Sequence, residues 1–217
     1  MTTTTWATSD VPLAERAHAL RRTVREHVVP VEIDLSRRPE HVFADVAITE
    51  MGSLQVTSVQ ADPATVHRTP KPAEAGDEPV LFIGLRVSGE STAVQGGRTA
   101  VLRPGEIALY DTRHPYTLLF DHGVDLHFFR VPVRDIALPD AATARAVART
   151  PGSNGTVSGV TAGYLAQLAA SPRLKAAYGF SPQARRVARH RGQRDAPARD
   201  RVGPLRAEHR ARRTGPS

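Results

Sequence analysis

Short apolar runs of strand length alternate with turn-forming residues along the middle of the chain. The runs occupy residues 80–88, 91–95, 98–103, 106–111, 116–121 and 124–131. Between them lie residues that favour tight turns, namely Gly89, Gly96-Gly97, Pro104-Gly105, His114-Pro115 and His122-Gly123. Glycine supplies the positive φ angles that hairpin turns need, and proline fixes φ at the first turn position. Six strands at this spacing predict the antiparallel meander of an all-β sandwich or barrel.

An amphipathic helix is predicted ahead of this meander, over residues 11–27. Apolar side chains recur there every three or four positions, at Leu13, Ala17, Leu20, Val24 and Val28. Asp10 is a candidate cap for the helix, and Pro30 ends it.

Further strands are expected at residues 31–35, 43–49 and 54–60. Residues 1–10 are polar and rich in threonine, which predicts a disordered N-terminus, and the proline-rich residues 61–80 predict a loop. With the meander, eight or nine strands are available, enough for a jelly roll.

Two helices are predicted after the meander. Residues 140–149 are rich in alanine, which favours helix strongly, and a second helix is expected over residues 156–170. The apolar positions of the second helix fall on one face and are candidates for self-association: Val157, Val160, Tyr164, Leu165 and Leu168.

Several short motifs of the meander occur in an order that points to a known family. They are Gln95, Gly97 and Arg98 in one hairpin, Leu-Arg-Pro-Gly at residues 102–105, Tyr110-Asp111 and Pro115-Tyr116. Residues 31–139 thereby resemble the N-terminal ligand-binding and dimerisation domain of AraC/XylS-type transcription regulators. The resemblance implies a cupin-like jelly roll that binds a small-molecule effector. It also implies that the two following helices mediate dimerisation and that a pair of helix-turn-helix units comes after them.

The composition is that of a globular protein with a basic tail. Of the 217 residues, 40% are hydrophobic and 24% are charged, and no cysteine is present, which excludes disulfides and thiolate chemistry. Neither a signal peptide nor a long apolar segment is found, so we expect a cytoplasmic protein. Residues 181–217 hold 11 arginines and 3 acidic residues, a net charge of +8, which leaves 18 basic and 19 acidic residues, or −1, for the other 180.

The four predicted regions are therefore a disordered segment at 1–10, a helix and sensor domain at 11–139, linker helices at 140–177 and a disordered arginine-rich tail at 178–217. The tail is too polar and too short to form two helix-turn-helix units, so we expect sequence-specific DNA binding to be lost. The tail is rich in arginine, alanine, proline and glycine and has no lysine. This composition is also what a GC-rich gene gives when it is translated in a shifted reading frame. The alternatives are a frameshift product and a selected tail that binds nucleic acid without sequence preference.

Neither a metal, a cofactor nor catalysis is expected from the sequence. The nine histidines form no His-x-His pair, and Gly105 is followed by Glu106 where metal-binding cupins usually place a histidine. No Gly-x-Ser-x-Gly nucleophile motif is present. A small cupin enzyme, either an isomerase or a metal-dependent oxygenase, remains the alternative from a different class, beside the non-specific nucleic-acid binder.

Aromatic and polar residues of the meander are candidates for the ligand site: Phe82, Arg86, Tyr110, Tyr116, His127, Phe128 and Arg130. Strand alternation puts Phe128 and Arg130 on one face and His127 on the other, so at most one of these faces points inward. Arg98 and Arg103 flank turns, where we expect them to hold the hairpin. The expected partners are an unidentified effector and a second subunit, either a copy of this chain or a related intact regulator that would be inactivated in a mixed dimer.

Overall fold

The computed structural model describes residues 2–69, 78–150 and 157–170. The chain divides into one unit at Met1–Phe180 and a second at Ser181–Ser217, and the second unit lies outside the described residues. The predicted tail at 178–217 therefore lies there too, as do residues 171–177 of the predicted linker region.

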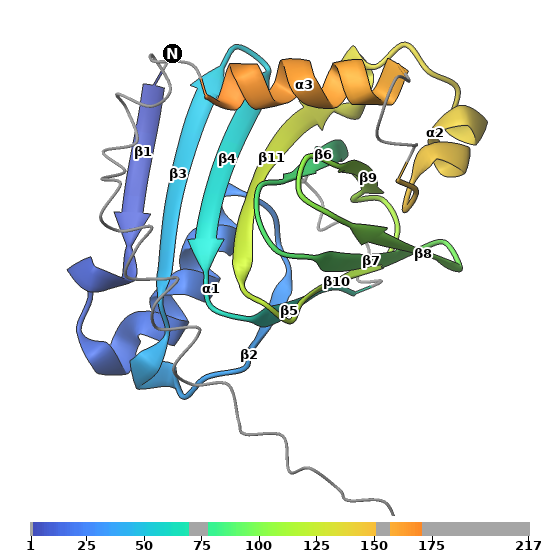
Figure 1. The fold of residues 1–217 in the computed structure, drawn as a ribbon. Coiled ribbons are helices and arrows are strands. Elements are labelled where there is room, and N and C mark those ends of the chain that lie inside the picture. The colour runs from blue at the N-terminus through green and yellow to red at the C-terminus, as the bar shows by residue number, and fades with distance from the viewer. Residues whose placement is uncertain (1, 70–77, 151–156, 171–217) are drawn as a thin grey trace, which may run out of the picture. The chain divides into compact units, whose positions relative to one another are not determined.

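Two antiparallel sheets form the first unit (Figure 1). The larger sheet has the order β1-β3-β4-β11-β6-β9, with strands at Thr2–Ala7, Ala44–Met51, Leu54–Ala61, Val124–Pro132, Val80–Arg86 and Ile107–Asp111. The smaller has the order β2-β5-β10-β7-β8, with strands at Glu32–Leu35, Ala64–Arg68, Tyr116–Phe120, Ser91–Gln95 and Arg98–Leu102. The prediction of a cupin-like β sandwich is confirmed, because two antiparallel sheets enclose a common apolar core.

Three α-helices accompany the sheets within the described residues: α1 at Arg16–His27, α2 at Asp140–Ala146 and α3 at Val157–Ala169. Ala17 and Leu20 of α1 are buried, and Val24 and Val28 pack against the cores on either side. Leu13 is 57% exposed because it lies in a separate 3₁₀ turn before the helix. The prediction that Asp10 caps this helix is wrong, because Asp10 lies in an earlier 3₁₀ turn. Helix α1 has no side-chain cap.

The prediction of a disordered segment at residues 1–10 is wrong for residues 2–10. Thr2–Ala7 forms β1, which pairs with β3 from Thr2 opposite Glu50 to Ala7 opposite Asp45. Threonine is β-branched and suits a strand, and the Thr3 and Thr49 hydroxyls are 2.9 Å apart within hydrogen-bonding range. The polar composition of this segment predicted disorder. In the structure, pairing with β3 stabilises it as the edge strand of the larger sheet.

A second difference concerns residues 64–68, which were expected to lie in a loop. They form β5, which pairs with both β2 and β10. Its five residues are too few to show a clear alternation among the surrounding prolines, and the two neighbouring strands supply its hydrogen bonds. The other predicted strands and helices are confirmed, with ends that differ by at most three residues except at the start of α1, which begins at Arg16 instead of residue 11.

Strand β11 separates two apolar layers. Leu126 and Phe128 face the core between the sheets, whereas Phe129 faces the opposite side. There Ala162, Leu165 and Ala169 of α3 pack on Phe129, Leu85 and Val56. Helix α3 therefore covers the outer face of the larger sheet, above β4 and β11 in Figure 1.

Candidate functional site

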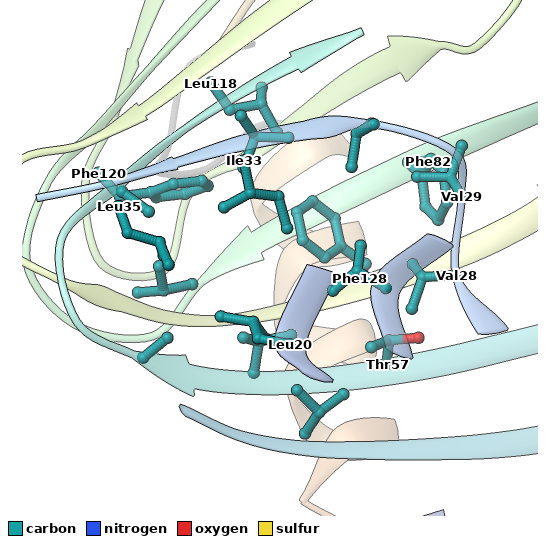
Figure 2. Close-up of a pocket in the computed structure, with 18 of the residues that line it drawn as sticks. Leu20, Val28, Val29, Ile33, Leu35, Thr57, Phe82, Leu118, Phe120 and Phe128 are labelled. Carbon is teal, nitrogen blue, oxygen red and sulfur yellow. The ribbon is translucent and has the colours of Figure 1, made fainter. Parts of the chain in front are cut away.

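An apolar cavity of about 90 Å³ lies between the two sheets (Figure 2). Phe82 and Phe128 enter it from the larger sheet, and Leu118 and Phe120 enter it from the smaller sheet. Its remaining side is closed by α1, the segment after it and β2, through Leu20, Val24, Val28, Val29, Val31, Ile33 and Leu35. The exposed wall of the cavity is carbon, so an apolar group is the occupant it favours.

Four aromatic rings make one wall of this cavity. Phe82 and Phe128 meet edge to face with their centroids 5.6 Å apart, and Tyr110 meets Phe128 at 6.2 Å in the same manner. The Tyr110 and Tyr116 rings are 6.0 Å apart. Edge-to-face packing stabilises such rings beyond their burial alone.

Gly84 makes room for this wall. A Cβ atom at this position would lie 2.7 Å from Cε2 of Tyr110 and 2.9 Å from its hydroxyl oxygen. Any residue other than glycine would therefore displace the Tyr110 ring toward the cavity.

Burial raises the pKa of both tyrosines well above the ordinary value. For Tyr110 the neighbouring Tyr116 raises its pKa further and Arg86 lowers it slightly, whereas for Tyr116 the Arg68 guanidinium opposes the effect of burial. Both hydroxyl groups therefore stay neutral and keep their protons near pH 7.

A polar hollow of about 320 Å³ adjoins the apolar cavity at one end of the sandwich. Val28 and Val29 line both spaces, so the two spaces adjoin at these residues. The hollow is otherwise lined by Arg25, Glu26, His27, Pro30, Glu50, Gln55, Arg68, Glu78, Val80, Thr112 and Arg130.

Four of the residues expected to contact a ligand line the apolar cavity: Phe82, Tyr110, Tyr116 and Phe128. Arg130 lines the polar hollow instead, and Arg86 and His127 line neither space. His127 points to the opposite face of β11, where its Nδ1 is 2.7 Å from the Ser58 hydroxyl. The sequence analysis did not name the residues of α1 and β2 as cavity lining. For α1, the apolar face of the helix was the signal that could have identified them.

Arg86 is buried at the other end of β6 and supports turns there. Its Nη2 donates to the carbonyl of Gly123 at 2.7 Å, its Nε donates to that of Gly89 at 3.4 Å, and its guanidinium lies 5.7 Å from the centre of the Phe120 ring. Nη1 has no hydrogen-bond acceptor among the described residues. Desolvation lowers the pKa of Arg86, while Asp125 and Tyr110 oppose that effect.

The candidate self-association residues of α3 separate into two groups. Leu165 is buried and Leu168 packs against the same cluster, so both contact the larger sheet of their own chain. Val160 and Tyr164, one helical turn apart, are 74% and 66% exposed. The side chain of Val157 lies outside the described residues.

Arg98 and Arg103 differ from each other. Arg98 was expected to hold its own hairpin, but it donates from Nε to the carbonyl of Val147 at 3.1 Å and from Nη2 to that of Ala144. It therefore anchors the C-terminal end of α2. Arg103 contacts Glu90 at 3.1 Å, and its backbone N–H donates to Glu106, so it does support the turns beside it.

Within the described part of the chain, no three His, Cys, Asp or Glu side chains gather where they could hold a metal ion. In residues 2–69, 78–150 and 157–170, no helix combines the length and apolar character needed to cross a membrane.

Comparison with known proteins gives one family. The sequence profile of the AraC-binding-like domain matches residues 20–213. A curated relative, described as an uncharacterized protein in the nit 5' region of Bacillus sp. (strain OxB-1), is 31% identical over 105 residues. That match covers 47% of this chain and 40% of the relative, so the chain spans less than half the length of this protein.

One solved structure shares the fold. The crystal structure of the AraC-like transcriptional activator CuxR has a TM-score of 0.64 and 17% identity, and the match covers 88% of this chain and 68% of that one. KdgF from Halomonas sp. matches 51% of this chain and 90% of its own, with a TM-score of 0.33 and 15% identity.

Proposed function

Because the chain belongs to the family of AraC-binding-like domains, related to the ligand-binding domains of AraC-type regulators, we propose that it binds a small effector between its two sheets. The apolar cavity is the observation that carries this proposal. Its wall comes from both sheets and from α1, so an occupant would contact elements that are far apart in sequence. Catalysis has no place in the proposal.

The size of the cavity limits what can enter it. Engineered apolar cavities of about 150 Å³ bind benzene and stay dry when empty. A space of about 90 Å³ suits a smaller apolar group or part of a larger ligand. Val59, which lines the cavity from β4, is a suitable position for filling it.

The proposal is tested by thermal unfolding under xenon, a neutral apolar probe that is smaller than benzene. A ligand that binds only the folded state raises its stability with concentration. We expect xenon to raise the Tm of the natural chain and to have no such effect on V59F, in which the larger ring occupies the cavity.

The matched control is V101F, the same substitution at a position that is 42% exposed on β8 and lines neither space. Its response to xenon should equal that of the natural chain. An unchanged Tm of the natural chain at every xenon pressure applied would contradict effector binding in this cavity.

A second proposed activity is self-association through the exposed face of α3. Val160 and Tyr164 are large side chains that a monomer exposes to water, and a second subunit would bury them. We expect Y164E to shift the chain toward the monomer in sedimentation velocity, whereas V101E should leave the distribution unchanged. A natural chain that sediments as a monomer at all accessible concentrations would refute this activity.

We further propose that residues 178–217 do not recognise a specific DNA sequence. In residues 178–217, only Val187, Val202 and Leu205 are aliphatic residues larger than alanine, which is too few for the cores of two helix-turn-helix units. Mixed dimers with a full-length relative are the proposed route by which this chain would act on transcription. Co-expression with a full-length relative, followed by affinity capture of one partner, should recover both; recovery of the tagged chain alone would exclude mixed dimers.

A further inference from the structure

We infer that the effector is an amphipathic organic anion, with an apolar body in the apolar cavity and a carboxylate or similar group in the polar hollow beside Arg130 and Arg68. The inference depends on the proposed function, because it names the chemical class of ligand for the same site. Neither half of this ligand would fit the other space, since one wall is carbon and the other carries three arginines.

The lining residues of the two spaces neighbour one another in the sheets. Phe128 and Arg130 are two residues apart on β11, so their side chains leave the same face of the sheet, about 7 Å apart along the strand. Phe82 lies opposite Arg130 in the pairing of β6 with β11, and Tyr116 lies opposite Arg68 in the pairing of β10 with β5. In each of these pairs the aromatic residue lines the apolar cavity and the arginine lines the hollow.

Arg68 is held in place before any ligand arrives. Its Nε donates to the carbonyl of Thr112 at 3.0 Å, and its Nη1 donates to that of Pro30 at 2.7 Å. Both acceptors are neutral, so the positive charge is not compensated by them. Nη2 has no acceptor among the described residues and remains for a ligand oxygen.

Arg130 is half-buried, and within the described residues it makes neither a hydrogen bond nor an ion pair. A guanidinium group in a partly enclosed space gains most from an ionised acceptor, which it can bind with two parallel hydrogen bonds. The absence of such an acceptor among the described residues points to an anion as the occupant.

The carboxylates of the hollow do not supply this partner. Glu78 pairs with the exposed Arg134, which lies outside the hollow, and Glu50 accepts a hydrogen bond from Gln55 at 2.7 Å. Glu26 is exposed on α1, as is Arg25. With Glu78 compensated by Arg134, three arginines face two carboxylates, and the hollow favours an anion over a cation.

The test compares hexanoate with hexanamide by isothermal titration calorimetry on the full chain. The two probes have the same apolar tail and differ only in the charge of the head group. We expect hexanoate to bind about tenfold or more tightly than hexanamide, because a charge-assisted hydrogen bond is about twice as strong as a neutral one. In R130Q this preference should fall by about tenfold while hexanamide binds as before, and R130K should retain part of it.

The control R103Q removes an exposed arginine that lines neither space, and it should keep the full preference for hexanoate. Circular dichroism of each variant establishes that it is folded. Equal binding of hexanoate and hexanamide, or an unchanged preference in R130Q, would overturn this inference while leaving the proposed function standing if xenon binds. Failure of xenon, hexanoate and hexanamide alike to bind would overturn both.

Discussion

Gly84 shows how a single residue determines the shape of the cavity. Because its hydrogen replaces a side chain, the ring of Tyr110 can pack directly on the backbone of β6. The neighbouring strands β9 and β11 leave no direction in which the backbone could move away, since β6 pairs with both.

We predict that G84A destabilises the fold by about 1–3 kcal/mol, the usual cost of forcing extra atoms into a packed core. Chemical denaturation measures this directly. G163A is the matched comparison, because Gly163 lies in α3 with no atom within 4 Å of an added Cβ. There the same substitution should stabilise the chain by up to about 1 kcal/mol through helix propensity. Equal stability of the two variants would contradict the contact with Tyr110.

Asp45 is a half-buried carboxyl group on β3 without a hydrogen-bond partner among the described residues. Its pKa is raised, mainly because burial penalises the charged form and secondarily because Asp10 is nearby. A carboxyl whose pKa is higher in the folded chain favours folding while it is protonated. This contribution is lost as the pH rises through the folded pKa.

We therefore predict that D45N has a higher Tm than the natural chain at pH 7. The difference should disappear below about pH 3.9, the ordinary pKa of an unfolded aspartate, where both forms are uncharged. Thermal unfolding at several pH values tests this, with D121N in an exposed turn as the control. A lower Tm for D45N at pH 7 would show that the carboxylate has a favourable role instead.

At the scale of elements, α2 depends on contacts with the smaller sheet and with β9. Arg98 of β8 donates to carbonyl groups at the end of the helix, and the backbone N–H of Ala148 donates to the carbonyl of Leu109 at 3.1 Å. Cations at a helix C-terminus stabilise it through the helix dipole as well as by hydrogen bonding. Arg98 therefore links the meander to the segment that leads toward α3.

We predict that R98A lowers the free energy of unfolding by about 1 kcal/mol, since these hydrogen bonds are partly exposed to water. Amide hydrogen exchange should accelerate at residues 143–148 and remain unchanged in the sheets. R103A, which removes the exposed contact with Glu90, is the control and should leave exchange in α2 as it was. Unchanged exchange in R98A would mean that backbone pairing alone holds the helix.

At the scale of the whole molecule, the charge is distributed unevenly. Residues 181–217 carry a net charge of +8, from 11 arginines and 3 acidic residues, and the formal net charge of the chain is +7. A polycation of this kind binds nucleic acid by releasing counterions, which makes the affinity depend steeply on salt.

We predict that the full chain binds double-stranded DNA without sequence preference at low salt and loses most of this affinity by about 200 mM salt. A chain that ends at residue 180 should not bind under either condition. Fluorescence anisotropy with two unrelated oligonucleotides measures both effects. Binding that discriminates between the oligonucleotides, or that persists at high salt, would contradict a purely electrostatic interaction.

The fold was largely predictable because its signals are local. Each hairpin of the meander carries its own turn residues, so Gly96-Gly97 and Pro104-Gly105 mark the strand ends without reference to the rest of the chain. Strands β1 and β5 lack such signals. Their hydrogen bonds come from β3, β2 and β10, which are distant in sequence, and only those pairings distinguish them from loops.

The candidate site was only partly predictable. Alternation along β11 places Phe128 and Arg130 on one face and His127 on the other, but it does not say which face is enclosed. The structure places Phe128 at the cavity and His127 beside Ser58, because α3 covers the opposite side of the sheet. Arg98 likewise gave no local indication that it would contact α2.

By itself, the sequence determined the strands and turns of the meander, the apolar face of α1 and the family resemblance. These depend on the conformational preferences of neighbouring residues and on periodicity. Tertiary structure alone decided that an apolar cavity and a polar hollow meet at Val28 and Val29, and that Arg130 lies beyond Phe128 in that hollow. Such a boundary forms only when helix and sheets pack together, because each element contributes one wall and none of them encloses a space alone.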